Sequence, residues 1–160
     1  MDWRRLPDLG PRGEGWVAAQ IVLFVVIAAA GAAGPVWSGV PRATGIATGI
    51  VLIGLGGLLA VRGVLDLREN LTPFPKPMDG AQLVEGGAYR LVRHPIYGGL
   101  VIASVGWGLA TASLPALLGT VVLAAFFDLK SRREELWLGD RYPGYPAYRS
   151  RTRRLIPWVY

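Results

Sequence analysis

The stretch IYGGLVIASVGWGLATASLPALLGTVVLAAFFDL, residues 96–129, decides the fold of this 160-residue chain. It holds two apolar runs, residues 96–113 and 114–130, which meet at the short segment TASLP. Each run is barely long enough to cross a hydrocarbon core of about 30 Å as a helix. The stretch therefore predicts a helical hairpin that crosses a membrane twice, with a tight turn at Pro115.

Two further apolar runs precede this hairpin. Residues 16–34 are long enough to span a membrane, and Pro35 ends the run. A cleaved signal peptide is the alternative, because Arg4 and Arg5 precede the run and small residues end it. We favour a retained span, since these arginines lie too far from the apolar residues for a good export signal. With the run at residues 44–67, the sequence predicts an all-α polytopic membrane protein with four transmembrane helices.

The run at residues 44–67 is rich in glycine, which allows a neighbouring helix to approach closely. These glycines are Gly45, Gly49, Gly54, Gly56 and Gly57. Near the end of the run, Arg62 and Asp66 lie four residues apart, on one helix face. Two interpretations of Arg62 stay open: it forms an ion pair at the lipid headgroups, or it faces an internal polar pocket.

The composition agrees with a membrane protein and limits the chemistry. Hydrophobic residues make up 52% of the chain, and the mean hydropathy is +0.37. The net charge is +6, and the basic residues flank the apolar runs, which suits anionic lipids better than nucleic acid. The chain has no cysteine and one histidine, His94, so we expect neither a Cys nucleophile nor a metal site.

The distribution of charge predicts the orientation in the membrane. Arginine and lysine gather before the first run, between the second and third runs, and after the fourth. Only Arg42 lies between the first two runs, and the turn of the hairpin carries no charge. Since positive residues stay in the cytoplasm, both termini and the long connection at residues 68–95 are expected there.

The unusual polar residues gather on this cytoplasmic side. His94 precedes Pro95, which disfavours helical geometry at His94 and suits the first position of a helix. His94 is therefore expected to cap the third helix, where unpaired backbone N–H groups favour an anion. Gly98 and Gly99 keep the first helical turn open. The single imidazole thus marks a candidate binding site.

Glu134 and Glu135 follow the fourth run, across the hairpin from His94. An anion-binding helix start that faces two carboxylates would suit a zwitterionic ligand with hydroxyl groups. Two simpler interpretations stay open: the RHP sequence is a juxtamembrane basic cap without a ligand, or the glutamates belong to a solvated face with ion pairs.

Two motifs in this half of the chain resemble a known family. GGAYRLVRHPIYGGL is followed by the hairpin and then by REELWLGDRYPGYPAYRSRTRRLIP. Over about residues 70–160, this order resembles the isoprenylcysteine carboxyl methyltransferase and phospholipid methyltransferase group of integral membrane enzymes. The segment NLTPFPKP is typical of bacterial members, so the resemblance implies a multi-pass protein of a bacterial inner membrane.

The resemblance implies a methyltransferase that uses S-adenosylmethionine and releases S-adenosylhomocysteine. It implies a cytoplasmic cofactor pocket, formed by the third and fourth helices and completed by the C-terminal tail. The four runs are expected to form a single membrane-embedded domain of residues 1–160. Carried over by position, the cofactor-binding residues are Tyr89, His94, Pro95, Tyr97, Gly98, Glu134, Glu135, Leu138 and Tyr148. The stretch YPGY stands where the family often has Phe-Gly, which can shift the tail tyrosines by one residue.

The acceptor would be lipidic or a small hydrophobic molecule that enters from the membrane. Arg93 and Arg62 are the residues proposed to orient an anionic acceptor. An isoprenoid carboxylate, a phospholipid amine and a small thiol all remain open as acceptors. The alternatives to an enzyme are a small four-helix transporter and a membrane scaffold. A transporter of this kind needs an ionisable residue near mid-membrane, and the first run of this chain carries no charge.

Overall fold

The computed structural model describes residues 6–34 and 37–160, and within these residues the protein is all-α, with no β-strand. Arg4, Arg5 and Pro35, which entered the sequence argument, lie outside the described residues. The helices are α1 (Glu14–Ala32), α2 (Gly39–Leu67), α3 (Pro95–Ala110), α4 (Leu114–Arg141) and α5 (Tyr145–Arg151), with short 3₁₀ turns at Arg68–Asn70 and Gly87–Arg90.

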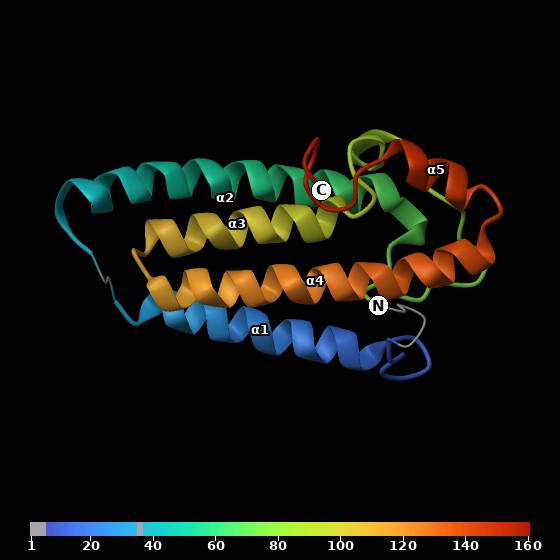
Figure 1. Ribbon diagram of the computed structural model, residues 1–160, viewed down its shortest axis with the longest axis horizontal. Coiled ribbons are helices and arrows are strands. Elements are labelled where there is room, and N and C mark those ends of the chain that lie inside the picture. Colours follow the sequence, from blue (N-terminus) through green and yellow to red (C-terminus); the bar gives the residue numbers. More distant parts are fainter. Residues whose placement is uncertain (1–5, 35–36) are drawn as a thin grey trace.

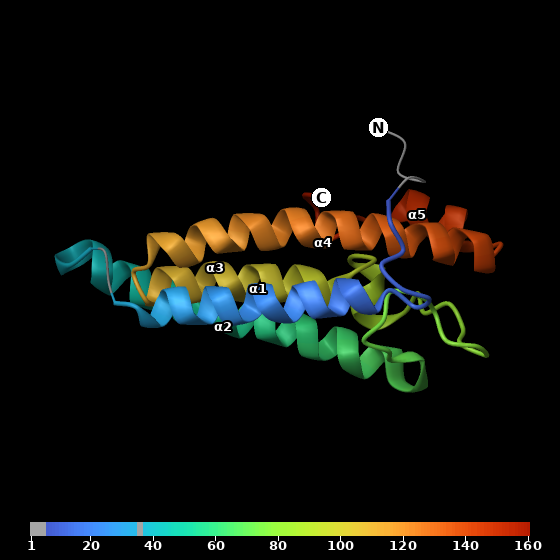
Figure 2. The same cartoon turned by 90° about the horizontal axis from the view of Figure 1, so that it is seen from below.

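The four longer helices run side by side in alternating directions (Figures 1 and 2). α3 lies between α2 and α4, and α1 packs mainly on α4. The start of α1, the connection between α2 and α3, and α5 gather at one end of the molecule (Figure 1). This arrangement places all the candidate polar residues at that end.

Three helices are long and apolar enough to cross a membrane: α1, α2 and α4 have mean hydropathies of 2.1, 2.1 and 1.5 over their most apolar windows. Their outward faces expose large apolar side chains, such as Val22, Val51 and Val121, as expected of lipid-facing surfaces. α3 is shorter, at 16 residues. The four expected runs are therefore all helical, and three of them reach the length of a span.

The glycines of α2 divide into two sets. A Cβ at Gly49 or Gly56 would overlap the backbone of α3, at Gly106 and Gly99 respectively, so these positions bring the two backbones into contact. Gly54 and Gly57 have open space where a Cβ would lie. Close packing between α2 and α3 therefore depends on one helix face.

The turn of the hairpin is anchored to α1. Ser113 caps α4: its hydroxyl oxygen accepts a 3.2 Å hydrogen bond from the Ala116 backbone, while the hydroxyl donates to the Ala30 carbonyl over 2.8 Å. The fourth helix is expected from the sequence to continue past the membrane to about Leu138, and α4 in fact ends at Arg141. The polar half of α4 thereby carries the glutamates to the end where the loops gather.

Candidate functional site

A cavity of about 360 Å³ lies at this end, within the range of small-molecule sites. Its wall is formed by all five α-helices together with the connection at residues 70–84. Val17 and Val64 form part of its apolar lining. Its polar lining includes His94, Tyr97, Lys130 and Glu134 from α3 and α4, and Tyr89, Tyr142, Tyr145 and Tyr148.

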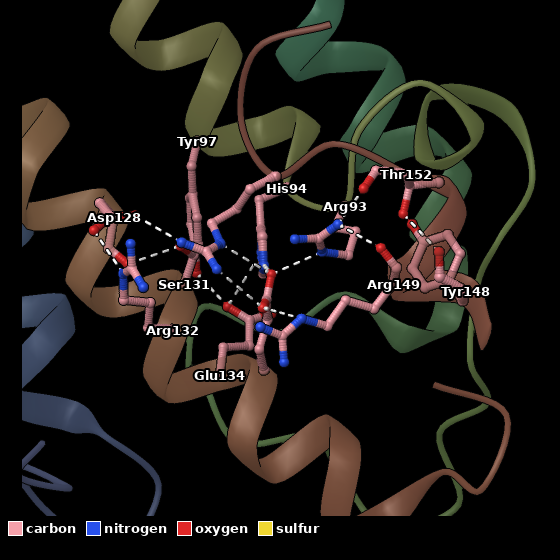
Figure 3. Close-up of polar contacts among 12 residues, drawn as sticks. Arg93, His94, Tyr97, Asp128, Ser131, Arg132, Glu134, Tyr148, Arg149 and Thr152 are labelled. Carbon is pink, nitrogen blue, oxygen red and sulfur yellow. Dashed lines mark hydrogen bonds and ion pairs between the residues drawn. The ribbon is translucent and has the colours of Figure 1, made fainter. Parts of the chain in front are cut away.

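The start of α3 has the geometry that the sequence predicts. His94 is the N-cap in a non-helical conformation, and Pro95 occupies the first turn. The buried imidazole lies between two carboxylates. Its Nδ1 is 3.8 Å from Oε2 of Glu134 (Figure 3). Its Nε2 is 3.4 Å from Oε1 of Glu135. The cap of α3 therefore faces the glutamates of α4 across the hairpin.

Tyr97 joins this pair to the core. Its hydroxyl donates a 2.9 Å hydrogen bond to Oε2 of Glu134. Its ring stacks on His94 at 5.4 Å and on Phe127 at 4.7 Å between centroids. A column of three rings thus positions the imidazole and the Glu134 carboxylate at the cavity wall.

The neighbouring Glu135 has a different environment. Its Oε1 accepts hydrogen bonds from Nε of Arg93 over 2.8 Å and from Nε of Arg154 over 3.2 Å. Arg93 also donates to the backbone carbonyls of Arg149 and Thr152. Burial acts to lower the pKa of Arg154, but the Glu135 carboxylate outweighs it and holds that pKa above its ordinary value. Glu135 thus fastens the C-terminal tail to the hairpin.

The tail also pairs with the residues before α3. The Arg93 N–H donates to the Arg153 carbonyl over 2.8 Å, and the His94 N–H donates to the Arg154 carbonyl over 3.0 Å. A Cβ at Gly98 would overlap the Leu155 carbonyl, so this glycine admits the tail against the first turn of α3. One side of the helix start is therefore covered by protein.

The connection at residues 70–84 forms another wall of the cavity and is held at both ends. The Lys76 N–H donates to the Arg12 carbonyl over 3.4 Å, and the Arg12 guanidinium lies 4.2 Å from the Phe74 ring centroid. The Tyr142 hydroxyl donates to the Ala81 carbonyl over 2.8 Å. The proline-rich segment is therefore an ordered part of the site.

Two tyrosines of α5 complete the wall. The Tyr148 hydroxyl donates to the Tyr89 carbonyl over 2.7 Å. The Tyr145 hydroxyl is buried and has no hydrogen-bond partner within the described residues. Burial raises the pKa of both phenols, so both stay protonated at neutral pH. The Tyr145 O–H is a donor left free beside the cavity.

The family model for phospholipid methyltransferases matches residues 44–144, which include most of α2 and all of α3 and α4. The chain belongs to the phospholipid methyltransferase family. Membership confirms the family resemblance of the sequence motifs, and with the three apolar helices it identifies an integral membrane protein of a methyltransferase family. A search of curated proteins found no match to the chain.

In this family member, the structure divides the sequence-predicted site residues into three groups. Those that line the cavity are Tyr89, Arg93, His94, Tyr97, Glu134, Leu138 and Tyr148. Pro95, Gly98 and Glu135 lie outside its lining and shape the helix start and the tail behind it. Arg62 is not brought to the cavity: its side chain is 58% exposed and lies 3.6 Å from Asp66. Of the two interpretations of Arg62, the ion pair is the one that the structure shows.

Lys130 and Gln20 are cavity residues that the sequence argument missed. Nζ of Lys130 donates a 2.6 Å hydrogen bond to Oε1 of Gln20 on α1, and it lies 4.9 Å from the Tyr97 ring centroid. The signal was present in the sequence, because Lys130 ends the fourth apolar run one helical turn before Glu134. From the sequence alone, Lys130 is one of the positive charges that flank the membrane spans.

Proposed function

We propose that the protein transfers a methyl group from S-adenosylmethionine, bound from the cytosol, to a lipidic or small hydrophobic acceptor. One observation supports this function above others: a phospholipid methyltransferase family member has a cavity lined by Glu134, His94 and Tyr97 where the α3–α4 hairpin ends. A transporter or a scaffold would leave this combination without a purpose.

The residues of the cavity fit the chemistry of the cofactor. The Glu134 carboxylate suits an ammonium group or ribose hydroxyls. The stacked Tyr97 ring offers an aromatic face to a sulfonium, and the buried Tyr145 hydroxyl lacks an acceptor that a ligand can supply. A volume of about 360 Å³ agrees with a small-molecule site.

We assign two kinds of role to the site residues. Those that would contact the cofactor are Tyr89, His94, Tyr97, Glu134, Leu138, Tyr145 and Tyr148. Glu135 and Arg93 are positioning residues, because their charged groups bind each other and the tail. Pro95 and Gly98 shape the helix start, and their side chains need not touch the cofactor.

The cofactor, when bound, supplies a methyl group already activated by a positive sulfur. The protein's task is then to bind, to orient and to exclude water, which in favourable cases lowers a barrier by about 7–11 kcal/mol. The proline-rich connection and α5 enclose the site on the cytosolic side, and α1 and α2 contribute apolar residues on the membrane side. An amphiphilic acceptor would enter between helices, and its headgroup would meet the cofactor inside this enclosure.

The same proposal includes the topology. α3 crosses with its longer neighbours as the fourth span, so that residues 1–160 form one membrane domain whose cofactor-binding half is about residues 70–160. The termini and the connection between α2 and α3 face the cytoplasm, in a bacterial inner membrane. The alternating helix directions and the gathering of loops at one end support this arrangement (Figure 1).

Activity is tested with the purified protein, methyl-labelled S-adenosylmethionine and a total bacterial lipid extract. The expected result is label in the organic phase, and its chromatographic position reveals the acceptor class. Glu134→Gln should reduce the label, whereas Glu85→Gln, on an exposed ion pair, should not. Absence of label from the wild-type reaction, together with no binding of S-adenosylhomocysteine, would overturn the proposal.

A further inference from the structure

Lys130 is a buried cation that the proposed chemistry has not used. Its side chain is 1% exposed, yet it lines the cavity. Its hydrogen-bond and ring partners are neutral: the Gln20 amide oxygen and the face of the Tyr97 ring. The Glu134 carboxylate, one helical turn further along α4, attracts the ammonium from a distance. Among the residues that the structure describes, no carboxylate forms an ion pair with it. A buried ammonium that makes no direct ion pair is costly, so the arrangement favours an anionic ligand group in contact with it.

Its position distinguishes Lys130 from Glu134. The two residues are four apart on α4 and share one face, with Lys130 one turn closer to the apolar part of the helix. The Glu134 carboxylate is held by the Tyr97 hydroxyl and faces His94. Gln20, the partner of Lys130, lies on α1, and Val17 of the same helix also lines the cavity. The cavity therefore has an acidic group towards the cytosol and a basic group towards the membrane.

From this polarity we propose that Lys130, positioned by Gln20, binds the anionic headgroup of the acceptor amphiphile. The inference rests on the proposed function and adds to it the residue that binds the carboxylate or phosphate of the headgroup. The charge on Lys130 discriminates against a headgroup that is only cationic, because like charges in an apolar enclosure repel. Lys130 is thus a specificity-determining residue of the acceptor end of the cavity.

The test measures binding of four probes that share one chain: oleate, oleyl phosphate, oleyl alcohol and oleylamine. Titration calorimetry is performed in maltoside micelles with S-adenosylhomocysteine at saturation. Wild type should bind the two anionic probes more tightly than the alcohol, and the amine most weakly. Lys130→Met should lose about tenfold in affinity for the anionic probes, with little change for the alcohol. The two anionic arms distinguish a carboxylate site from a phosphate site.

Three further variants keep the test decisive. Lys76→Gln is the matched control, because Lys76 is the other lysine of the chain, is exposed and lies outside the cavity lining. Gln20→Glu gives Lys130 a carboxylate partner, so it should fold well and still lose the preference for anionic probes. It covers the case in which Lys130→Met does not fold. Lys130→Arg keeps the charge and should retain the preference.

The outcomes separate this inference from the proposed function. If S-adenosylhomocysteine binds equally to wild type and Lys130→Met while the anionic probes lose affinity, the inference holds. If Lys130→Met and Gln20→Glu bind the four probes as wild type does, the inference is wrong and the methyltransferase proposal stands. The same holds if the affinity lost in Lys130→Met is affinity for S-adenosylhomocysteine. If wild type does not bind S-adenosylhomocysteine, the proposed function itself fails.

Discussion

The Glu135 carboxylate accepts a 2.8 Å hydrogen bond from Arg93, which joins the polar half of α4 to the residue before the cap of α3. Glu134, the adjacent residue, points instead to the cavity and to the Tyr97 hydroxyl (Figure 3). One glutamate therefore holds the fold of the site, and its neighbour is available to a ligand.

Glu135→Gln should unfold more easily than Glu134→Gln. Removing the Glu135 charge leaves the buried Arg93 guanidinium without a counter-charge, at a cost of about 3–5 kcal/mol, and leaves Arg154 with Asp128 as its remaining carboxylate partner. Thermal unfolding in detergent measures the difference. Glu85→Gln, which breaks an exposed pair with Arg151, is the control and should change the midpoint little. Equal midpoints for the Glu134 and Glu135 variants would refute the assigned roles.

Gly56→Ala should destabilise the contact between α2 and α3. The added Cβ overlaps the Gly99 carbonyl, and such overpacking costs about 1–3 kcal/mol. Gly54→Ala is matched to it, because its Cβ meets open space and alanine favours a helix by up to about 1 kcal/mol. Unfolding midpoints should therefore move in opposite directions. A lowered midpoint for both variants would contradict the one-sided packing of α2.

Tyr145→Phe should weaken cofactor binding without changing stability, whereas Tyr148→Phe should lower stability. The Tyr145 hydroxyl has no partner in the described structure, so its removal should leave stability unchanged and weaken S-adenosylhomocysteine binding by roughly threefold to tenfold. Removal of the Tyr148 hydroxyl leaves the Tyr89 carbonyl without its donor and should cost about 1–3 kcal/mol of stability. Calorimetry with thermal unfolding checks both. Unchanged affinity in Tyr145→Phe would remove that hydroxyl from the site.

Single cysteines can test the topology, because the chain has none of its own. Ser150→Cys lies on α5, at the end where the loops gather, and Ser38→Cys lies just before α2, at the opposite end (Figure 1). A membrane-impermeant maleimide should label the cysteine at position 150 only from the cytoplasmic side and that at position 38 only from the other side. Labelling of both from one side would exclude the four-span arrangement.

The sequence predicted the helices and the hairpin because apolar runs, Pro95 and the Ser113–Pro115 turn act locally. It could not separate the two glutamates. Adjacent helical residues point about 100° apart, and the rotation of α4 depends on contacts with other segments. Arg154, which binds Glu135, is 19 residues away, on a tail whose path is not a local property. Likewise, the sequence could not predict that Lys130 lines the cavity, because its partner Gln20 lies on α1, far away in the chain.

Binding of S-adenosylhomocysteine to wild type and Glu134→Gln, measured by titration calorimetry, tests the central claim most directly. The account predicts that wild type binds, that Glu134→Gln weakens binding by about tenfold while remaining folded, and that Glu85→Gln binds as wild type does. Equal affinity of wild type and a folded Glu134→Gln would contradict the placement of the cofactor at the cytosolic end of the α3–α4 hairpin.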